Sequence, residues 1–128
     1  MGGYLLDTHA AFWLLNNDKA LSNRARRIIN DLSNSMYISI ASVWELAIKI
    51  NIGKLNFNGR ITGFLRLARA NKINIFPIEP AHLKIYENLP LIHRDPFDRL
   101  LVATAIAEEM TLITTDEDIA KYDVPRIW

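Results

Sequence analysis

Four acidic side chains in this sequence are spaced so that folding would bring them to one place. Each stands beside an apolar run, and they are Asp7, Glu45, Asp98 and Asp116. Asp7 and Asp116 directly follow strand-like runs, so parallel strands would place both at the same edge of a sheet. Two carboxylates about 5 Å apart repel each other by roughly 3 kcal/mol at an effective dielectric near 20, so such a cluster requires a cation.

The ligand types favour magnesium or manganese as that cation. The chain has no cysteine, and sites built only from carboxylate oxygens prefer Mg²⁺ or Mn²⁺ to Zn²⁺. A cation held in this way activates water and neutralises the charge that develops on a phosphate group. This chemistry needs no serine, cysteine or histidine nucleophile. The four acids therefore predict hydrolysis of a phosphodiester, with all four as catalytic groups and metal ligands.

Each acid also has a purely structural interpretation. Asp98 lies three residues after Asp95, which is the spacing of a helix capping box. Glu45 and Lys49 are spaced for an ion pair on one helix face, and Asp116 is placed to cap a following turn. Independent caps and ion pairs have no reason to gather at one edge of a sheet. Their convergence would therefore distinguish a catalytic cluster from separate structural roles.

Strand and helix signals alternate along the whole chain. Short apolar or β-branched runs predict strands at 4–6, 36–40, 73–78, 111–115 and 124–127. Helical spacing predicts helices at 10–15 after a Thr8 cap, from Ser22 to Leu32, from Ser42 to Ile50, and at 61–70, 80–88 and 95–110, with a helical turn at 117–122. Strands separated by helices predict an α/β domain over residues 1–128, whose mostly parallel sheet of about five strands is covered on both faces.

Composition limits the compartment and the partners. The chain has 128 residues, no cysteine, no visible targeting or membrane-spanning segment and a net charge of +1. A cytoplasmic protein without a disulfide framework is expected. Residues 46–78 contain six basic residues and no acidic residue. This basic stretch is either a solvated helix surface or a cationic face for a polyanion.

Four segments together resemble a known family. They are 5–9 (LLDTH), 42–49 (SVWELAIK) with 53–55 (GKL), 93–101 (HRDPFDRLL) and 114–116 (TTD). In this order they are similar to the successive motifs of the PIN domain, and in particular of the VapC-like toxins of toxin-antitoxin pairs. The resemblance implies a three-layer α/β/α endoribonuclease that cuts single-stranded or looped RNA with Mg²⁺ or Mn²⁺. It also implies a homodimer that a cognate antitoxin holds inactive.

Carried over by motif, the resemblance implies an acidic quartet of Asp7, Glu45, Asp98 and Asp116. Thr114 matches the hydroxyl residue two positions before the last acid, and Asp118 is a second candidate for that last acid.

Several other polar residues are candidates for supporting roles. His93, like His9, lies beside a motif acid and would contact a phosphate, relay a proton or serve as a structural donor. Arg99 would clamp a substrate phosphate or pair with a carboxylate. Thr8 and Ser42 would orient acids or cap helices.

Two other classes of protein are considered. A receiver domain requires paired acids after its first strand and a lysine after a late strand, whereas Thr8 follows Asp7 here and an acid stands at the lysine's place. A haloacid-type phosphatase requires a second aspartate two residues after Asp7, where this chain has His9. A catalytically idle module that binds RNA or a partner through the basic stretch remains the main alternative.

Overall fold

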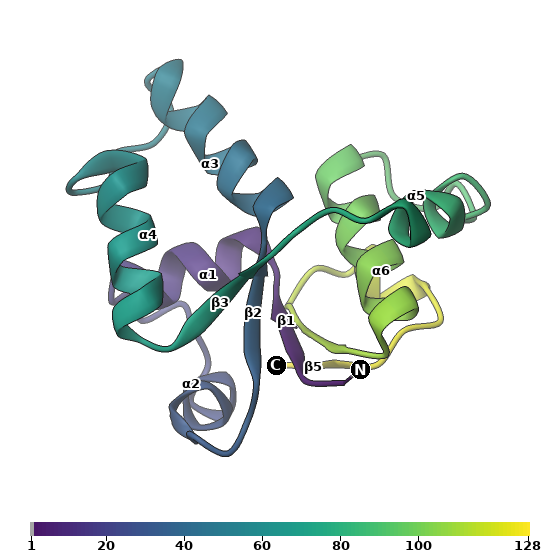
Figure 1. The fold of residues 1–128 in the computed structure, drawn as a ribbon, viewed down its shortest axis with the longest axis horizontal. Coiled ribbons are helices and arrows are strands. Elements are labelled where there is room, and N and C mark those ends of the chain that lie inside the picture. The colour runs from purple at the N-terminus through teal and green to yellow at the C-terminus, as the bar shows by residue number, and fades with distance from the viewer. Residues whose placement is uncertain (1) are drawn as a thin grey trace.

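The computed structural model describes residues 2–128, which form five strands, six α-helices and one short 3-10 helix (Figure 1). The strands are β1 (Tyr4–Leu6), β2 (Met36–Ser39), β3 (Ile73–Phe76), β4 (Thr111–Ile113) and β5 (Arg126–Ile127). The α-helices are α1 (Thr8–Leu15), α2 (Asn23–Asn30), α3 (Ile40–Asn51), α4 (Arg60–Ala70), α5 (Pro80–Tyr86) and α6 (Pro96–Glu108), and the 3-10 helix is η1 (Ile119–Lys121). Within residues 2–128, no helix is both long and apolar enough to span a bilayer.

The sheet is entirely parallel, with strand order β3-β2-β1-β4-β5. Leu6, at the end of the central strand, is in register with Ile38 on one side and Ile113 on the other. The carboxyl ends of β1, β2 and β4 are therefore level. The residues that follow these strands meet at one edge, where parallel sheets of this kind bind ligands.

Helices cover both faces of the sheet. Leu6, Ile38 and Ile113 point into one apolar core, which they share with residues of α1 to α4. Leu5 and Leu112 point into a second core, which they share with α6 and η1. Figure 1 shows α1 to α4 on one side of the strands, and α5 and α6 on the other. The predicted three-layer α/β/α arrangement is confirmed.

Two predicted helix caps are wrong. Asp7, not Thr8, is the N-cap of α1, and Ser39, not Ser42, is the N-cap of α3. In each case the helix begins almost directly after the strand: Asp7 is the single residue between β1 and α1, and Ser39 is the last residue of β2, so each already stands at the cap position. Thr8 and Ser42 are instead buried inside the first turns, where their side chains face other residues.

The structure also shortens several predicted elements. α2 ends at Asn30 because Asp31 adopts an extended backbone conformation, so Leu32 is 77% exposed instead of packed in the core. Strands β2, β3 and β4 each end before the last residue predicted for them. These differences lie at element ends, where helix and strand signals are weakest.

Candidate active site

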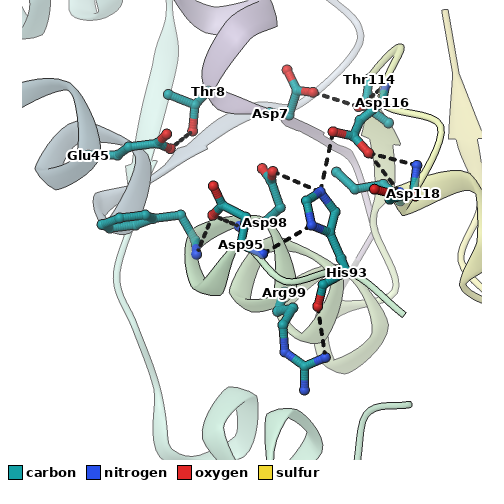
Figure 2. Close-up of polar contacts among 12 residues, drawn as sticks. Asp7, Thr8, Glu45, His93, Asp95, Asp98, Arg99, Thr114, Asp116 and Asp118 are labelled. Carbon is teal, nitrogen blue, oxygen red and sulfur yellow. Dashed lines mark hydrogen bonds and ion pairs between the residues drawn. The ribbon is translucent and has the colours of Figure 1, made fainter. Parts of the chain in front are cut away.

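Asp7 is held at the carboxyl end of β1 by hydrogen bonds to both of its carboxylate oxygens. Oδ1 accepts a hydrogen bond from the backbone N–H of Ala10 at 2.7 Å, and Oδ2 accepts one from the hydroxyl of Thr114 (Figure 2). The side chain is nearly buried, with 3% of its surface exposed. Burial raises the pKa of Asp7 although both hydrogen bonds act to lower it. The fold therefore holds this carboxylate in place and makes its charged form less favourable than in water.

Thr114 links Asp7 to Asp116. Its hydroxyl donates to Asp7 and accepts a hydrogen bond from the backbone N–H of Asp116 at 3.0 Å. The carboxylate of Asp116 has two roles. Oδ1 caps the following turn by accepting the N–H groups of Asp118 and Ile119 at 2.8 and 2.9 Å, while Oδ2 lies 3.3 Å from Nε2 of His93. The capping interpretation of Asp116 thus accounts for only one of its oxygens.

Asp98 is not part of a capping box. Asp95 caps α6 by itself, because its carboxylate accepts the N–H groups of Phe97 and Asp98. The carboxylate of Asp98 turns away from the helix end, and Oδ2 lies 3.1 Å from Nε2 of His93. This carboxylate is available to the cluster.

The pKa of Asp98 is raised to about 7. Burial is the main cause, followed by the negative charge of Asp95, while His93 opposes the shift and Asp116 and Asp7 add smaller increases. Three acids of the predicted quartet therefore lie within electrostatic reach of one another. Holding all of them charged is unfavourable without a cation.

His93 occupies the space between Asp98 and Asp116. Nδ1 accepts the backbone N–H of Asp95 at 3.1 Å, so the ring proton is on Nε2, which points at both carboxylates. Figure 2 shows this ring between the two acids. One ligand atom from each of these three residues lies within 4.8 Å of the others. A positively polarised N–H group thus already stands where a cation would bind.

Glu45 stands at the other end of the site. Oε1 accepts a hydrogen bond from the hydroxyl of Thr8 at 2.7 Å, and Oε2 lies 3.0 Å from Nζ of Lys49. The hydroxyl of Ser42 lies 3.0 Å from that of Thr8. The predicted Glu45–Lys49 ion pair therefore exists, and Thr8 orients Glu45 instead of capping a helix.

The donor set fits a hard divalent cation. The site offers carboxylate oxygens of Asp7, Asp98 and Asp116, and two of these acids have raised pKa values. Within residues 2–128, neither Asp98 nor Asp116 is paired with a lysine or an arginine. Mg²⁺ and Mn²⁺ prefer such oxygen ligands. Asp7, Asp98 and Asp116, with Glu45 at the side, are the residues that would hold it.

Comparison with known families and structures agrees with this fold. Residues 4–125 match the family model of the PIN domain. The chain belongs to the PIN domain family. Members of this family are generally nucleases, which hydrolyse phosphodiester bonds.

Several solved structures superpose on nearly the whole chain. VapBC2 of Rickettsia felis, bound to a DNA fragment from its promoter, superposes with a TM-score of 0.76 at 19% identity, covering 100% of this chain and 99% of that one. FitAcB of Neisseria gonorrhoeae has a TM-score of 0.67 at 19% identity, covering 98% and 96%. DNA-bound VapBC of Salmonella typhimurium has a TM-score of 0.69 at 15% identity, covering 100% and 98%. A comparison with curated proteins gave no match.

Arg99 of this PIN domain has neither of its predicted roles. Its Nη1 donates to the carbonyl oxygens of Pro90 and His93 at 3.0 and 3.3 Å and lies 3.2 Å from the hydroxyl of Tyr122. The guanidinium also lies 5.1 Å from the ring centroid of Tyr86. Arg99 is buried and fixes the loop before α6 instead of clamping a phosphate or pairing with a carboxylate.

The side chains of two further candidates make no hydrogen bond to the clustered acids. The carboxylate of Asp118 pairs with Lys121 at 3.1 Å and is about half exposed, so Asp116 is the acid that faces His93. His9 is exposed, and its ring contacts Trp13 with centroids 5.6 Å apart.

Sequence reasoning missed Tyr122. Its hydroxyl accepts the backbone N–H of His93 at 2.9 Å and donates to the carbonyl of Pro90 at 2.9 Å. It thereby holds the segment that carries His93 against the core of the PIN domain. No local pattern indicates this role, because the bonded residues are 29 and 32 positions apart.

Tyr122→Phe is expected to lower the free energy of unfolding by about 1–3 kcal/mol, because it leaves the N–H of His93 and the carbonyl of Pro90 without this partner. Urea denaturation would measure the change. Tyr37→Phe is a matched control, since Tyr37 is also partly buried and its hydroxyl makes no hydrogen bond to another residue between 2 and 128. Equal stabilities of the two variants would contradict the role assigned to Tyr122.

Proposed function

We propose that this protein is an endoribonuclease that uses Mg²⁺ or Mn²⁺ to hydrolyse phosphodiester bonds of single-stranded or looped RNA. The observation that carries the proposal is the gathering of Asp98, Asp116 and Asp7 at one edge of the sheet, where burial first, and the neighbouring negative charges second, raise the pKa of Asp98 to about 7. A structural protein gains nothing from such repulsion, whereas a metal-dependent hydrolase requires it.

The residues of the site have different roles in this reaction. When bound, the divalent cation would supply an activated water and charge neutralisation at the phosphate. Asp98 and Asp116 would hold the cation, and the hydrogen bonds of Thr114 fix Asp7 next to Asp116. Glu45, which the hydroxyl of Thr8 orients, would be a further ligand for the cation at the opposite end of the site. His93, whose Nε2–H points at the two carboxylates, would donate this proton in a hydrogen bond to a phosphate oxygen.

We further propose that this enzyme is the toxin of a toxin-antitoxin pair and works in the cytoplasm as a homodimer. The support comes from the matched motifs and from the superposed structures, which include VapBC and FitAcB complexes. An apolar hollow between α3, α5 and α6 would give a protein partner a surface to cover, since Trp44 at its rim is 61% exposed. A chain without cysteine suits the reducing cytoplasm.

The test is cleavage of a mixed single-stranded RNA by the purified chain, free of any partner, in Mg²⁺, in Mn²⁺ and in EDTA. Cleavage is expected in both metals and not in EDTA. Asp123→Asn, which removes an exposed carboxylate, should retain full activity. RNA that is bound equally well with and without metal, but never cut, would support the idle binding module instead.

A further inference from the structure

A second hollow opens beside the active site, between α1 and α3. Its volume is about 350 Å³. Its wall includes Thr8, His9, Trp13, Lys49 and Lys54. Its surface is mostly apolar with a polar margin, and none of the side chains that line it is a carboxylate. It therefore differs in chemistry from the acidic cluster next to it.

The hollow and the acidic site share a wall. Thr8 lines the hollow, and its hydroxyl donates to Glu45 at 2.7 Å. Lys49 also lines the hollow, and its Nζ lies 3.0 Å from Oε2 of Glu45. Figure 2 shows Thr8 and Glu45 together at one end of the polar network. A polymer bound across the acidic site would reach the hollow with its next unit.

Aromatic rings form one side of the hollow. His9 is exposed, and its ring is tilted by 34° from the ring of Trp13, with centroids 5.6 Å apart. Trp13 is fixed from behind by Trp128, which meets it edge-on at 5.7 Å. Flat rings at the rim of a hollow accept a nucleobase by stacking, and they do so with any base.

Two lysines form the other side. Lys49 is paired with Glu45, but Lys54 is exposed and forms no ion pair with any residue between 2 and 128. Both belong to the stretch 46–78, which has no acidic residue. Lys54 therefore offers an unneutralised positive charge to an anion in the hollow.

We propose that this hollow binds one nucleotide of a single-stranded RNA, next to the phosphate at the acidic site, with its base against His9 and Trp13 and its phosphate toward Lys54. The inference rests on the proposed nuclease function and adds a place where the substrate is held. An acidic peptide would use the lysines but would leave the aromatic side unexplained. Stacking without hydrogen-bond readout implies little preference among bases at this position.

Binding is tested in the full chain carrying Asp98→Asn, so that RNA is held without being cut. The probes are an oligouridylate about six nucleotides long and an abasic ribose-phosphate chain of equal length and charge. Oligouridylate is expected to bind about tenfold more tightly than the abasic chain, and His9→Ala should remove most of this difference. Trp13 is left in place because it packs against the core.

Lys54→Ala should weaken both probes equally, by about threefold to tenfold, and reduce the salt dependence of binding by about one charge. Lys84→Ala is the matched control, since Lys84 is an exposed lysine on α5, across the sheet from the hollow. It should change neither affinity.

Unchanged oligouridylate binding in both His9→Ala and Lys54→Ala would overturn the nucleotide site, even if the wild-type chain cuts RNA. A second result would also overturn the nucleotide site. If oligoglutamate of the same charge binds and loses affinity in Lys54→Ala, while oligouridylate does not bind, the ligand is an acidic peptide. The proposed nuclease function has a separate test. It is contradicted if the wild-type chain cuts no RNA in Mg²⁺ or Mn²⁺, even when oligouridylate still binds more tightly than the abasic chain.

Discussion

Asp98→Asn is expected to lower the rate of RNA cleavage by about a thousandfold or more and, at the same time, to make the metal-free protein more stable. The loss follows because Asp98 is the acid that faces both His93 and the other carboxylates. The gain follows because an amide removes a charge that the fold holds at an unfavourable pKa of about 7. Above pH 7 the increase in the free energy of unfolding should be about 1–3 kcal/mol.

The amide is a conservative replacement at this position. The oxygen of asparagine can still accept the Nε2–H of His93, and the helix cap is unaffected because Asp95 supplies it alone. Circular dichroism should therefore show an unchanged fold. Cleavage is measured in Mg²⁺ and Mn²⁺, and stability by urea denaturation in EDTA.

Asp123→Asn, with an exposed carboxylate, is the control for removing one negative charge. It should change neither property. A folded Asp98→Asn variant that cuts RNA at the wild-type rate would remove Asp98 from the proposed metal site. A fall in its metal-free stability would show that the carboxylate is structural.

Asp7→Asn is a less conservative change than the same substitution at Asp98. Both oxygens of Asp7 accept hydrogen bonds, one from Ala10 and one from Thr114. An asparagine has only one acceptor oxygen, so one donor would lose its partner. This variant should also lose activity, but without the gain in stability that is expected for Asp98→Asn.

The sheet and the helix that carries Asp98 were predictable because their signals are local. Asp95 followed by Pro96 is a strong helix start, and the structure confirms that α6 begins there. Apolar runs separated by helices also predicted the parallel sheet, and its register brings Asp7 and the residues after β4 to one edge. The approximate place of the cluster therefore follows from the order of elements.

The details of the site were not predictable, because they depend on contacts between distant segments. Thr8 is indistinguishable from a helix cap in sequence, and only the packing of α1 against α3 turns it toward Glu45. Arg99 has the chemistry of a phosphate clamp, but the loop that it binds closes over it through Tyr122. In both cases a residue 23 or more positions away decides the role.

The metal-free protein is expected to lose stability as the pH rises from 5 to 8. The carboxyl group of Asp98 has a pKa of about 7 in the folded chain and 3.8 as its model value, so the folded state binds its proton more tightly than the unfolded state does. The free energy of unfolding therefore falls as the pH rises between these two values, and it levels above pH 7. From pH 5 to pH 8 the contribution of Asp98 should be a loss of about 2–3 kcal/mol.

Subtraction isolates the contribution of this carboxyl group from the contributions of the other titratable groups. Urea denaturation in EDTA is carried out at several pH values on the wild type and on Asp98→Asn, and the difference between them is the contribution of Asp98. Burial also raises the pKa of Asp7, which acts in the same direction but remains in both proteins. The pKa of Asp116 is lowered, since hydrogen bonds from Ile119 and His93 outweigh its burial, so it affects stability only under more acidic conditions.

A divalent cation should reverse the trend, because it binds the charged carboxylate and displaces the proton. Below pH 7 the apparent affinity for Mg²⁺ or Mn²⁺ is expected to rise about tenfold per pH unit, with one proton released per ion from Asp98. Calorimetric titration in two buffers of different ionisation enthalpy counts that proton. The Asp98→Asn variant should bind the ion weakly and release one proton fewer than the wild type. An affinity for the ion that is independent of pH between 5 and 7 in the wild type would mean that the ion does not bind at Asp98.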